Sequence, residues 1–173
     1  MSTARRHAFV LFGAVACAAA GAWADPGTGG VEVIALRHSE AALRATYTRG
    51  KRVELPRLVV LDGQGRVVLG ETGYRPGAAG RAEEALRRDR ALATPITLAA
   101  ILAETETADG KPLAATDLPP ADAYVVDWWA EWCAPCRMLT RDLAAALARW
   151  HDRRVVWLQI ESDPTKQHPH DAS

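Results

Sequence analysis

The chain has 173 residues, of which 49% are hydrophobic, and its 21 basic and 21 acidic residues give a formal net charge of zero. This balance favours neither nucleic acid nor an anionic membrane as a partner, because both attract basic proteins. The length suits one domain with a proper hydrophobic core and is short for two.

Residues 1–24 have the three-part composition of a secretory signal peptide. Two arginines form a basic start, an apolar run covers residues 8–22, and Ala-Trp-Ala ends the segment. The run is shorter than the roughly 18 residues expected of a membrane span. We therefore expect cleavage after Ala24, a periplasmic mature protein and no stable membrane insertion. An uncleaved anchor, or lipid attachment at Cys17, is the alternative.

Cleavage would change the charge and the cysteine count. Loss of Arg5 and Arg6 leaves 19 basic against 21 acidic residues in the predicted domain 25–173, and only Cys133 and Cys136 remain as cysteines. A disulfide between them closes a four-residue loop, which constrains the unfolded chain far less than a long loop does. Stability is therefore a weak reason to keep the pair.

The first half of this domain, residues 31–90, predicts a strand, a helix, a hairpin and a second helix. Residues 31–36 are apolar and β-branched, and the following helix begins with Ser39 as its N-cap. Two apolar runs then flank Asp-Gly-Gln-Gly within residues 55–74, which is a hairpin signature. Residues 75–93 form an amphipathic helix whose arginine-rich face is a solvated surface.

A connector, residues 91–120, separates this half from the next. Residues 95–102 favour a helical turn or two, a second hairpin is expected around Asp109, and two prolines break the chain at its end. The second half, residues 121–163, and a polar tail, residues 164–173, complete the domain.

The second half predicts a strand, a helix and a strand. Residues 123–132 are continuously apolar, as in a strand buried on both faces. Residues 133–150 repeat leucine and alanine at helical spacing, and residues 153–162 form another buried strand. Such a unit favours a parallel pair joined by a right-handed crossover.

The two cysteines lie at the N-terminus of that predicted helix, where they can exchange electrons with a substrate disulfide. The helix dipole and its unpaired N–H groups stabilise a thiolate and lower the thiol pKa from about 8.5. Cys133, nearest the helix start, is the predicted nucleophile. Cys136, one turn further in, would resolve the mixed disulfide.

Metal binding is the main alternative use of this cysteine spacing. Structural zinc needs four ligands, and the sequence has no second cysteine pair. The pair could instead bind copper or zinc together with His168 and His170, although two histidines in a frayed tail need no ligand role. We expect no metal and no cofactor other than the redox-active disulfide.

The stretch VVDWWAEWCAPCRML, residues 125–139, resembles the active-site strand and helix of the thioredoxin family. The resemblance implies that Asp127 is a buried carboxylate that assists deprotonation of Cys136, with a pKa raised by burial. It also implies that Trp132 and Pro135 contact substrate. The other tryptophans of this half are interpreted as core. A strand-end carboxylate bound to backbone is the alternative for Asp127.

The chain departs from the family in two places. Arg141 stands where thioredoxins usually carry a helix-kinking proline, which predicts a straighter helix. The family also continues after the last strand with a cis-proline strand, a hairpin and a helix, and similar elements stand upstream here, at residues 53–90. Leu55 and Pro56 would form the cis bond facing the cysteines. A trans proline opening an edge strand is the alternative.

The predicted fold is therefore an α/β, thioredoxin-like three-layer structure with a central mixed sheet, in permuted element order. Residues 31–36 and 155–160 both suit the strand beside the active-site strand, so one must be additional or at an edge. The rival is a fragmentary, two-lobed chain whose redox site lacks its cis-proline wall.

The resemblance implies a periplasmic thiol-disulfide oxidoreductase that acts on protein thiol or disulfide substrates and is reset by a redox partner protein. Ala-Pro between the cysteines is close to the reducing type, which favours reduction of substrates. A Cys/His copper-binding module and a redox-inactive partner protein with a permanent disulfide are the other interpretations.

Overall fold

The computed structural model describes residues 30–48 and 54–163. The predicted leader and the tail with its two histidines lie outside the described residues. The elements in chain order are β1 (Gly30–His38), α1 (Glu40–Thr48), β2 (Arg57–Asp62), β3 (Val67–Thr72), α2 (Ala78–Arg88), α3 (Leu98–Ala103), β4 (Thr105–Thr107), the 3-10 helix η1 (Ala115–Asp117), β5 (Ala123–Trp129), α4 (Ala134–Leu147) and β6 (Arg154–Glu161).

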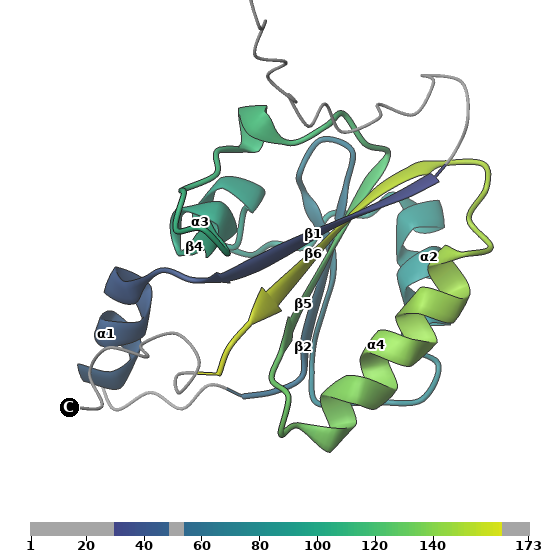
Figure 1. Cartoon of the computed structure of the whole chain (residues 1–173). Coiled ribbons are helices and arrows are strands. Elements are labelled where there is room, and N and C mark those ends of the chain that lie inside the picture. The colour runs from purple at the N-terminus through teal and green to yellow at the C-terminus, as the bar shows by residue number, and fades with distance from the viewer. Residues whose placement is uncertain (1–29, 49–53, 164–173) are drawn as a thin grey trace, which may run out of the picture.

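All the strands join in one mixed sheet of six, in the order β3-β2-β5-β6-β1-β4 (Figure 1). β5, β6 and β1 are parallel to one another. β2 runs antiparallel to β5, β3 to β2, and β4 to β1. The predicted strand-helix-strand unit is thus present, with α4 as the crossover between β5 and β6.

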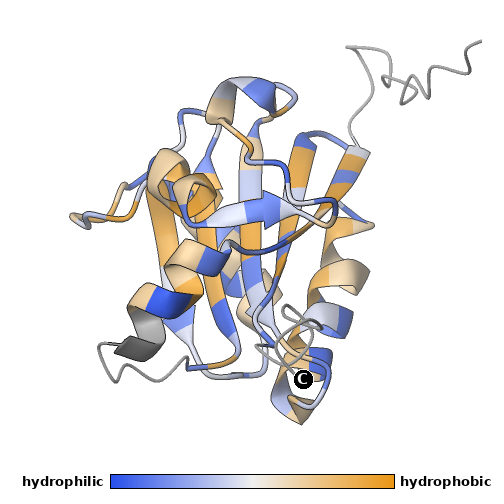
Figure 2. Ribbon diagram, turned by 60° about the vertical axis from the view of Figure 1, so that its left-hand side comes forward, coloured by the Kyte–Doolittle hydropathy of each residue, from blue (hydrophilic) through white to orange (hydrophobic). Residues whose placement is uncertain are grey.

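Helices cover both faces of the sheet, which gives the predicted three layers. α2 and α4 lie on one face, and α1 and α3 on the other (Figure 1). Val60 and Leu143 belong to the core under α2 and α4, whereas Val59 and Ile101 belong to the core under α3. Hydrophobic segments run through the strands, while the helices alternate in hydropathy (Figure 2). Because both faces are covered, the central strands are apolar on both sides.

The competition for the place beside β5 is resolved in favour of β6. β6 pairs with β5 along residues 155–161, and β1 pairs with the other edge of β6. β4 then covers only the end of β1, at Leu36 to His38. The first predicted strand is therefore the additional one, next to the sheet edge.

Asp62 organises the turn of the β2–β3 hairpin. Its Oδ1 accepts hydrogen bonds from the backbone N–H groups of Gln64 at 2.9 Å and Arg66 at 3.0 Å. Gly65 between them has φ of 74°, which a residue without a Cβ adopts readily. The Asp-Gly-Gln-Gly signature thus forms the predicted hairpin.

The hairpin is joined to the active-site strand, although it comes first in the chain. Residues 57–62 of β2 pair with residues 123–128 of β5. Tyr74, just after the hairpin, donates a hydrogen bond of 2.7 Å to Asp142 on α4. The two halves therefore form one structure rather than the two lobes of the rival interpretation. That this chain order is a circular permutation stays a prediction.

α4 is continuous across Arg141, which points to solvent with 74% of its side chain exposed. Among the described residues, no helix is both long enough and apolar enough to cross a membrane.

Truncation of Leu58 tests the core between β2 and α4. Leu58 is 1% exposed, so Leu58→Ala should lower the free energy of unfolding by about 2–5 kcal/mol through lost burial and a cavity. Leu92→Ala is the matched control, because Leu92 is 46% exposed and its truncation should change stability by about 0.5 kcal/mol or less. Urea denaturation measures both, and equal effects would contradict this account of the core.

Candidate active site

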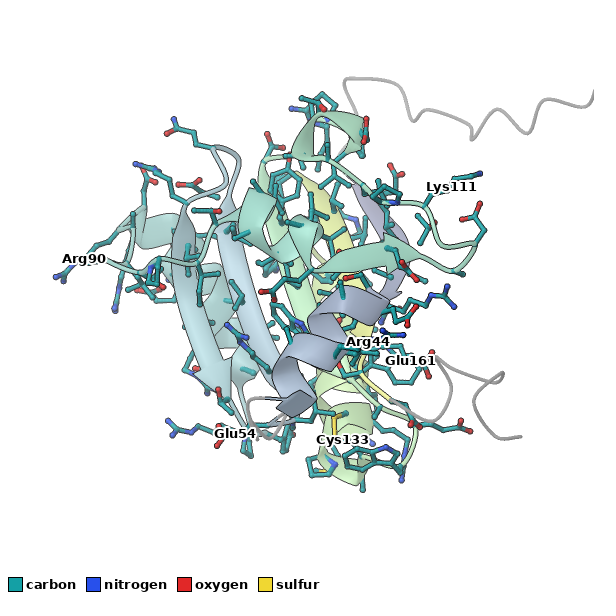
Figure 3. All side chains as sticks on the ribbon, turned by 90° about the vertical axis from the view of Figure 1, so that its left-hand side faces the viewer. Arg44, Glu54, Arg90, Lys111, Cys133 and Glu161 are labelled. Atoms are coloured by element: carbon teal, nitrogen blue, oxygen red, sulfur yellow. A yellow bond between two sulfur atoms is a disulfide. The ribbon has the colours of Figure 1, made fainter. Side chains whose placement is uncertain are left out.

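Cys133 and Cys136 form a disulfide, with their Cα atoms 5.2 Å apart, at the N-terminus of α4. Cys133 lies at the same end of the molecule as Glu54, which precedes β2, and at the opposite end from Lys111 (Figure 3). This is the end where β5 finishes, so the pair stands beyond the carboxyl edge of the parallel strands. Open α/β sheets usually bind ligands at that edge.

The local sequence explains why the helix begins at the cysteine pair. Cys133 is the N-cap with an extended backbone, and its N–H bonds the carbonyl of Ala130 at 3.0 Å. Pro135 occupies the first turn, where a missing N–H costs nothing because that group has no partner within the helix. The N–H of Cys136 donates to Sγ of Cys133 at 3.2 Å. An amide donor at a helix N-terminus would stabilise a thiolate on Cys133.

Apolar groups surround both sulfurs. Ala130 forms a buried cluster with the two cysteines, and Leu55 and Trp129 pack against it. The Leu55–Pro56 bond is cis, and Pro56 is buried. The wall that the rival interpretation would lack is thus present, formed by a segment far upstream in the chain.

The cysteines themselves are little exposed, whereas their surroundings include large exposed apolar side chains. Cys133 is 4% and Cys136 1% exposed, so both are buried in the oxidised protein. Trp132 is 65% and Met138 42% exposed. Pro135 is also exposed. The surface around the disulfide is therefore hydrophobic.

Asp127 lies on β5 on the side of α4 and is 1% exposed. Its Oδ1 accepts a 2.6 Å hydrogen bond from Nε1 of Trp157, and its Oδ2 accepts a 3.3 Å bond from the hydroxyl of Thr140. Burial raises the pKa of Asp127 to about 6, because desolvation outweighs the two hydrogen bonds. A carboxyl group with this pKa can accept and release a proton near neutrality.

Sequence reasoning missed the roles of Trp157, Thr140 and Trp129. Trp157 lies in the core, as predicted, and in addition donates to Asp127, while Trp129 packs against the disulfide cluster. Thr140 carried a signal, because residues i and i+4 share a helix face and Thr140 is four residues after Cys136. The indole N–H of Trp129 is buried without a hydrogen-bond partner.

A hollow of about 610 Å³ lies at the β2–β3 turn and α3, away from the disulfide. It is open, and its charged lining residue, Arg66, is already bonded to Asp62 and Asp89. It contains no pair of groups suited to acid–base or nucleophilic chemistry, so the disulfide is the candidate site. Within residues 30–48 and 54–163, no cluster of three or more histidine, cysteine or acidic residues is arranged to hold a metal ion.

Comparisons with known proteins point to the same region. Residues 115–173 match the thioredoxin family model. A thioredoxin of Streptomyces clavuligerus is 40% identical over 40 residues, 23% of this chain and 37% of that protein. Thioredoxins of Rickettsia bellii (strain RML369-C) and Acidithiobacillus ferridurans are 37% and 38% identical over 54 and 48 residues, which are 31% and 27% of this chain and 47% and 44% of those proteins.

The chain thus spans less than half the length of these curated relatives. No solved structure was found to match it. The helix-capped disulfide above a buried carboxylate defines a dithiol–disulfide site on an α/β sheet. With the match of residues 115–173, this shows that the second half of the chain is similar to the thioredoxin family.

Replacement of Asp127 tests whether burial raises the pKa of its carboxyl group. Below about pH 4 the carboxyl is protonated in both folded and unfolded chains, whereas above its folded pKa of about 6 the folded protein holds a buried charge. Wild-type stability therefore loses on the order of 3 kcal/mol across this window. Asp127→Asn should lack this loss, so its free energy of unfolding relative to wild type should rise as the pH increases from about 4 to 7.5.

Asp122→Asn is the control for this prediction. The N–H of Arg154 and its guanidinium hold the pKa of Asp122 below its usual value, so this carboxylate stabilises the fold when it is ionised. That stabilisation is lost only as the pH falls below about 4, so the effect of Asp122→Asn should stay nearly constant between about pH 4 and 7.5. Urea denaturation of the oxidised proteins at several pH values measures both, and a pH-independent effect of Asp127→Asn would show that Asp127 titrates normally.

Proposed function

We propose that this protein is a periplasmic thiol-disulfide oxidoreductase that reduces disulfide bonds in protein substrates. The observation that carries the proposal is the Cys133–Cys136 disulfide at the start of α4, with the buried carboxylate of Asp127 beneath the same helix. A stability role explains this arrangement poorly, because a bond that closes a four-residue loop removes little entropy from the unfolded chain.

The reaction begins from the reduced pair. The Cys133 thiolate, stabilised by the N-terminus of α4 and the N–H of Cys136, attacks one sulfur of the substrate disulfide. A bond forms between Cys133 Sγ and that sulfur, the substrate S–S bond breaks, and the second substrate sulfur leaves as a thiolate that takes a proton from solvent.

The second step releases the substrate. Cys136 gives its proton to Asp127 and attacks Cys133 Sγ, which forms the Cys133–Cys136 bond and breaks the bond to substrate. The remaining substrate sulfur leaves as a thiolate, and Asp127 returns its proton to solvent. Asp127 suits this role because, with a pKa of about 6, its carboxylate is mostly deprotonated at neutral pH and can accept a proton.

Substrate would dock on the apolar surface around the disulfide. Trp132 and Pro135 are exposed beside Cys133, and Leu55 packs against the cysteine cluster next to cis Pro56. An extended peptide laid along Leu55 would approach the sulfurs, and an aromatic anchor such as Trp132 supplies apolar contact area. A redox partner protein would use the same face to reset the pair.

Insulin reduction tests the enzymatic proposal. Wild type should reduce insulin in the presence of dithiothreitol, and Cys133→Ser should lower the rate to that of dithiothreitol alone because the nucleophile is lost. Cys136→Ser should instead accumulate a mixed disulfide with substrate, visible by mass on non-reducing analysis. If wild type is no faster than dithiothreitol, the protein is not a reductase of this kind.

Export is tested by expressing the full chain in a Gram-negative host. The periplasmic fraction should contain a protein whose N-terminal residue is Asp25, because the predicted leader ends at Ala24. Substitution of Arg5 and Arg6 by glutamate should slow processing, since the basic start is part of the signal. An unprocessed chain in the cytosolic fraction would contradict the periplasmic proposal.

A further inference from the structure

The buried carboxylate of Asp127 has two oxygens with chemically different partners. Oδ1 receives the indole N–H of Trp157 at 2.6 Å, and Oδ2 receives the hydroxyl of Thr140 at 3.3 Å. An indole nitrogen can only donate, whereas a hydroxyl can donate or accept by rotating. The partners therefore differ in which protonation states of the carboxyl group they tolerate.

A proton on Oδ1 would point at the indole N–H of Trp157. Both groups are then donors, so no hydrogen bond could form between them. A proton on Oδ2 could donate to Oγ1 of Thr140 while Oδ1, now a carbonyl oxygen, keeps its bond from Trp157. The neutral acid thus has one arrangement that satisfies every buried polar group. The ionised form is also satisfied, with each oxygen accepting one bond.

Oδ2 is also the oxygen on the side of the active-site helix. Thr140 and Cys136 are four residues apart on α4, so they lie one above the other on the same helix face. The oxygen that approaches Thr140 therefore faces the row of side chains that contains Cys136. Oδ1 faces β6 instead, where Trp157 is located.

We propose that Trp157 is a positioning residue that anchors Oδ1 of Asp127 and thereby directs the transferred proton of Cys136 to Oδ2. The inference rests on the proposed function, in which Asp127 accepts that proton. Trp157 does not contact the reacting sulfurs in this account and acts through Asp127.

The side chains that donate hydrogen bonds to Asp127 are both neutral. Its strand partner Leu58 and the α4 residue Leu139 belong with Trp157 to the apolar cluster under α4. On the α4 side, Cys136 is held in the disulfide and does not titrate in the oxidised protein. The shift in the pKa of Asp127 has no contribution from a charged side chain of the described residues.

Charged residues on the packed elements are engaged elsewhere. Arg57 on β2 stacks over the Trp128 ring, with its guanidinium carbon 4.6 Å from the centroid. Arg137 on α4 donates to the carbonyl of Glu131 at 2.7 Å, and Asp142 accepts from Tyr74. The two hydrogen bonds are thus the adjustable interactions of Asp127.

The test compares Trp157→Phe with Thr140→Val in the oxidised full-length protein, by infrared spectroscopy across pH with Asp127→Asn as the reference for difference spectra. In Trp157→Phe the carbonyl band of protonated Asp127 should move to higher frequency, because Oδ1 loses its donor. In Thr140→Val that band should stay in place. The reverse pattern would put the proton on Oδ1 and overturn the proposal.

The same spectra give the midpoint of the Asp127 titration. Loss of the short indole bond should raise it by about one pH unit, because a donor to a charged oxygen favours ionisation. Thr140→Val should raise it less, since its bond is longer. An unchanged midpoint in Trp157→Phe would show that the indole does not control the carboxyl group.

A measurement on the wild-type protein covers the case in which Trp157→Phe does not fold. The indole N–H resonance of Trp157 should titrate with the Asp127 midpoint in nuclear magnetic resonance spectra, and it should be pH-independent in Asp127→Asn. A resonance that ignores pH in wild type would overturn the proposal. Neither readout needs activity, so absence of insulin reduction would refute the proposed function without altering these results.

The pH dependence of substrate release shows whether Trp157 affects the reaction. If Asp127 serves Cys136, the pH profile of substrate release in Trp157→Phe should move upward with the spectroscopic midpoint, while attack by Cys133 keeps its wild-type profile. A shifted midpoint with an unshifted release profile would show that Trp157 positions Asp127 but that Asp127 is not the proton acceptor.

Discussion

The antiparallel pairing of β2 with β5 is the interaction on which the candidate active site depends. It aligns residues 57–62 with residues 123–128, segments separated by a helix pair and a long connector. Leu55, which packs against the cysteine cluster and precedes cis Pro56, is brought to the end of β5 because β2 continues from this segment. The bond between Tyr74 and Asp142 ties the same two parts on the side of α4.

The site combines two opposing demands on the fold. The proposed proton acceptor is a carboxylate whose pKa is brought near neutrality by burial, and a buried charge costs stability. Asp127 meets the first demand with a pKa of about 6 and limits the cost with two hydrogen bonds. Since both donors are neutral, the group remains able to change its protonation state, which a cationic partner would hinder. The Asp127 side chain thus affects both the stability of the fold and the proposed proton transfer.

Much of the fold could be predicted from local patterns. The hairpin followed from Asp-Gly-Gln-Gly, the α4 crossover from leucines at helical spacing, and the buried character of β5 from its continuous apolar run. The Ser39 cap was also predicted, and its hydroxyl accepts from the N–H of Ala42. The neighbour of β5 could not be predicted, because β1 and β6 have similar composition and only packing across the whole sheet separates them.

Local sequence patterns were enough to predict the groups of the candidate site. The cysteine spacing, the helix that follows and the aspartate in the preceding strand are local, because caps, periodicity and short loops act within a few residues. Only the tertiary structure decided which groups surround that chemistry. The indole of Trp157 on Oδ1 and the hydroxyl of Thr140 on Oδ2 come from different elements, and Leu55 arrives from some 80 residues earlier. Such contacts depend on strand order and register, which a linear pattern of hydrophobic residues does not encode.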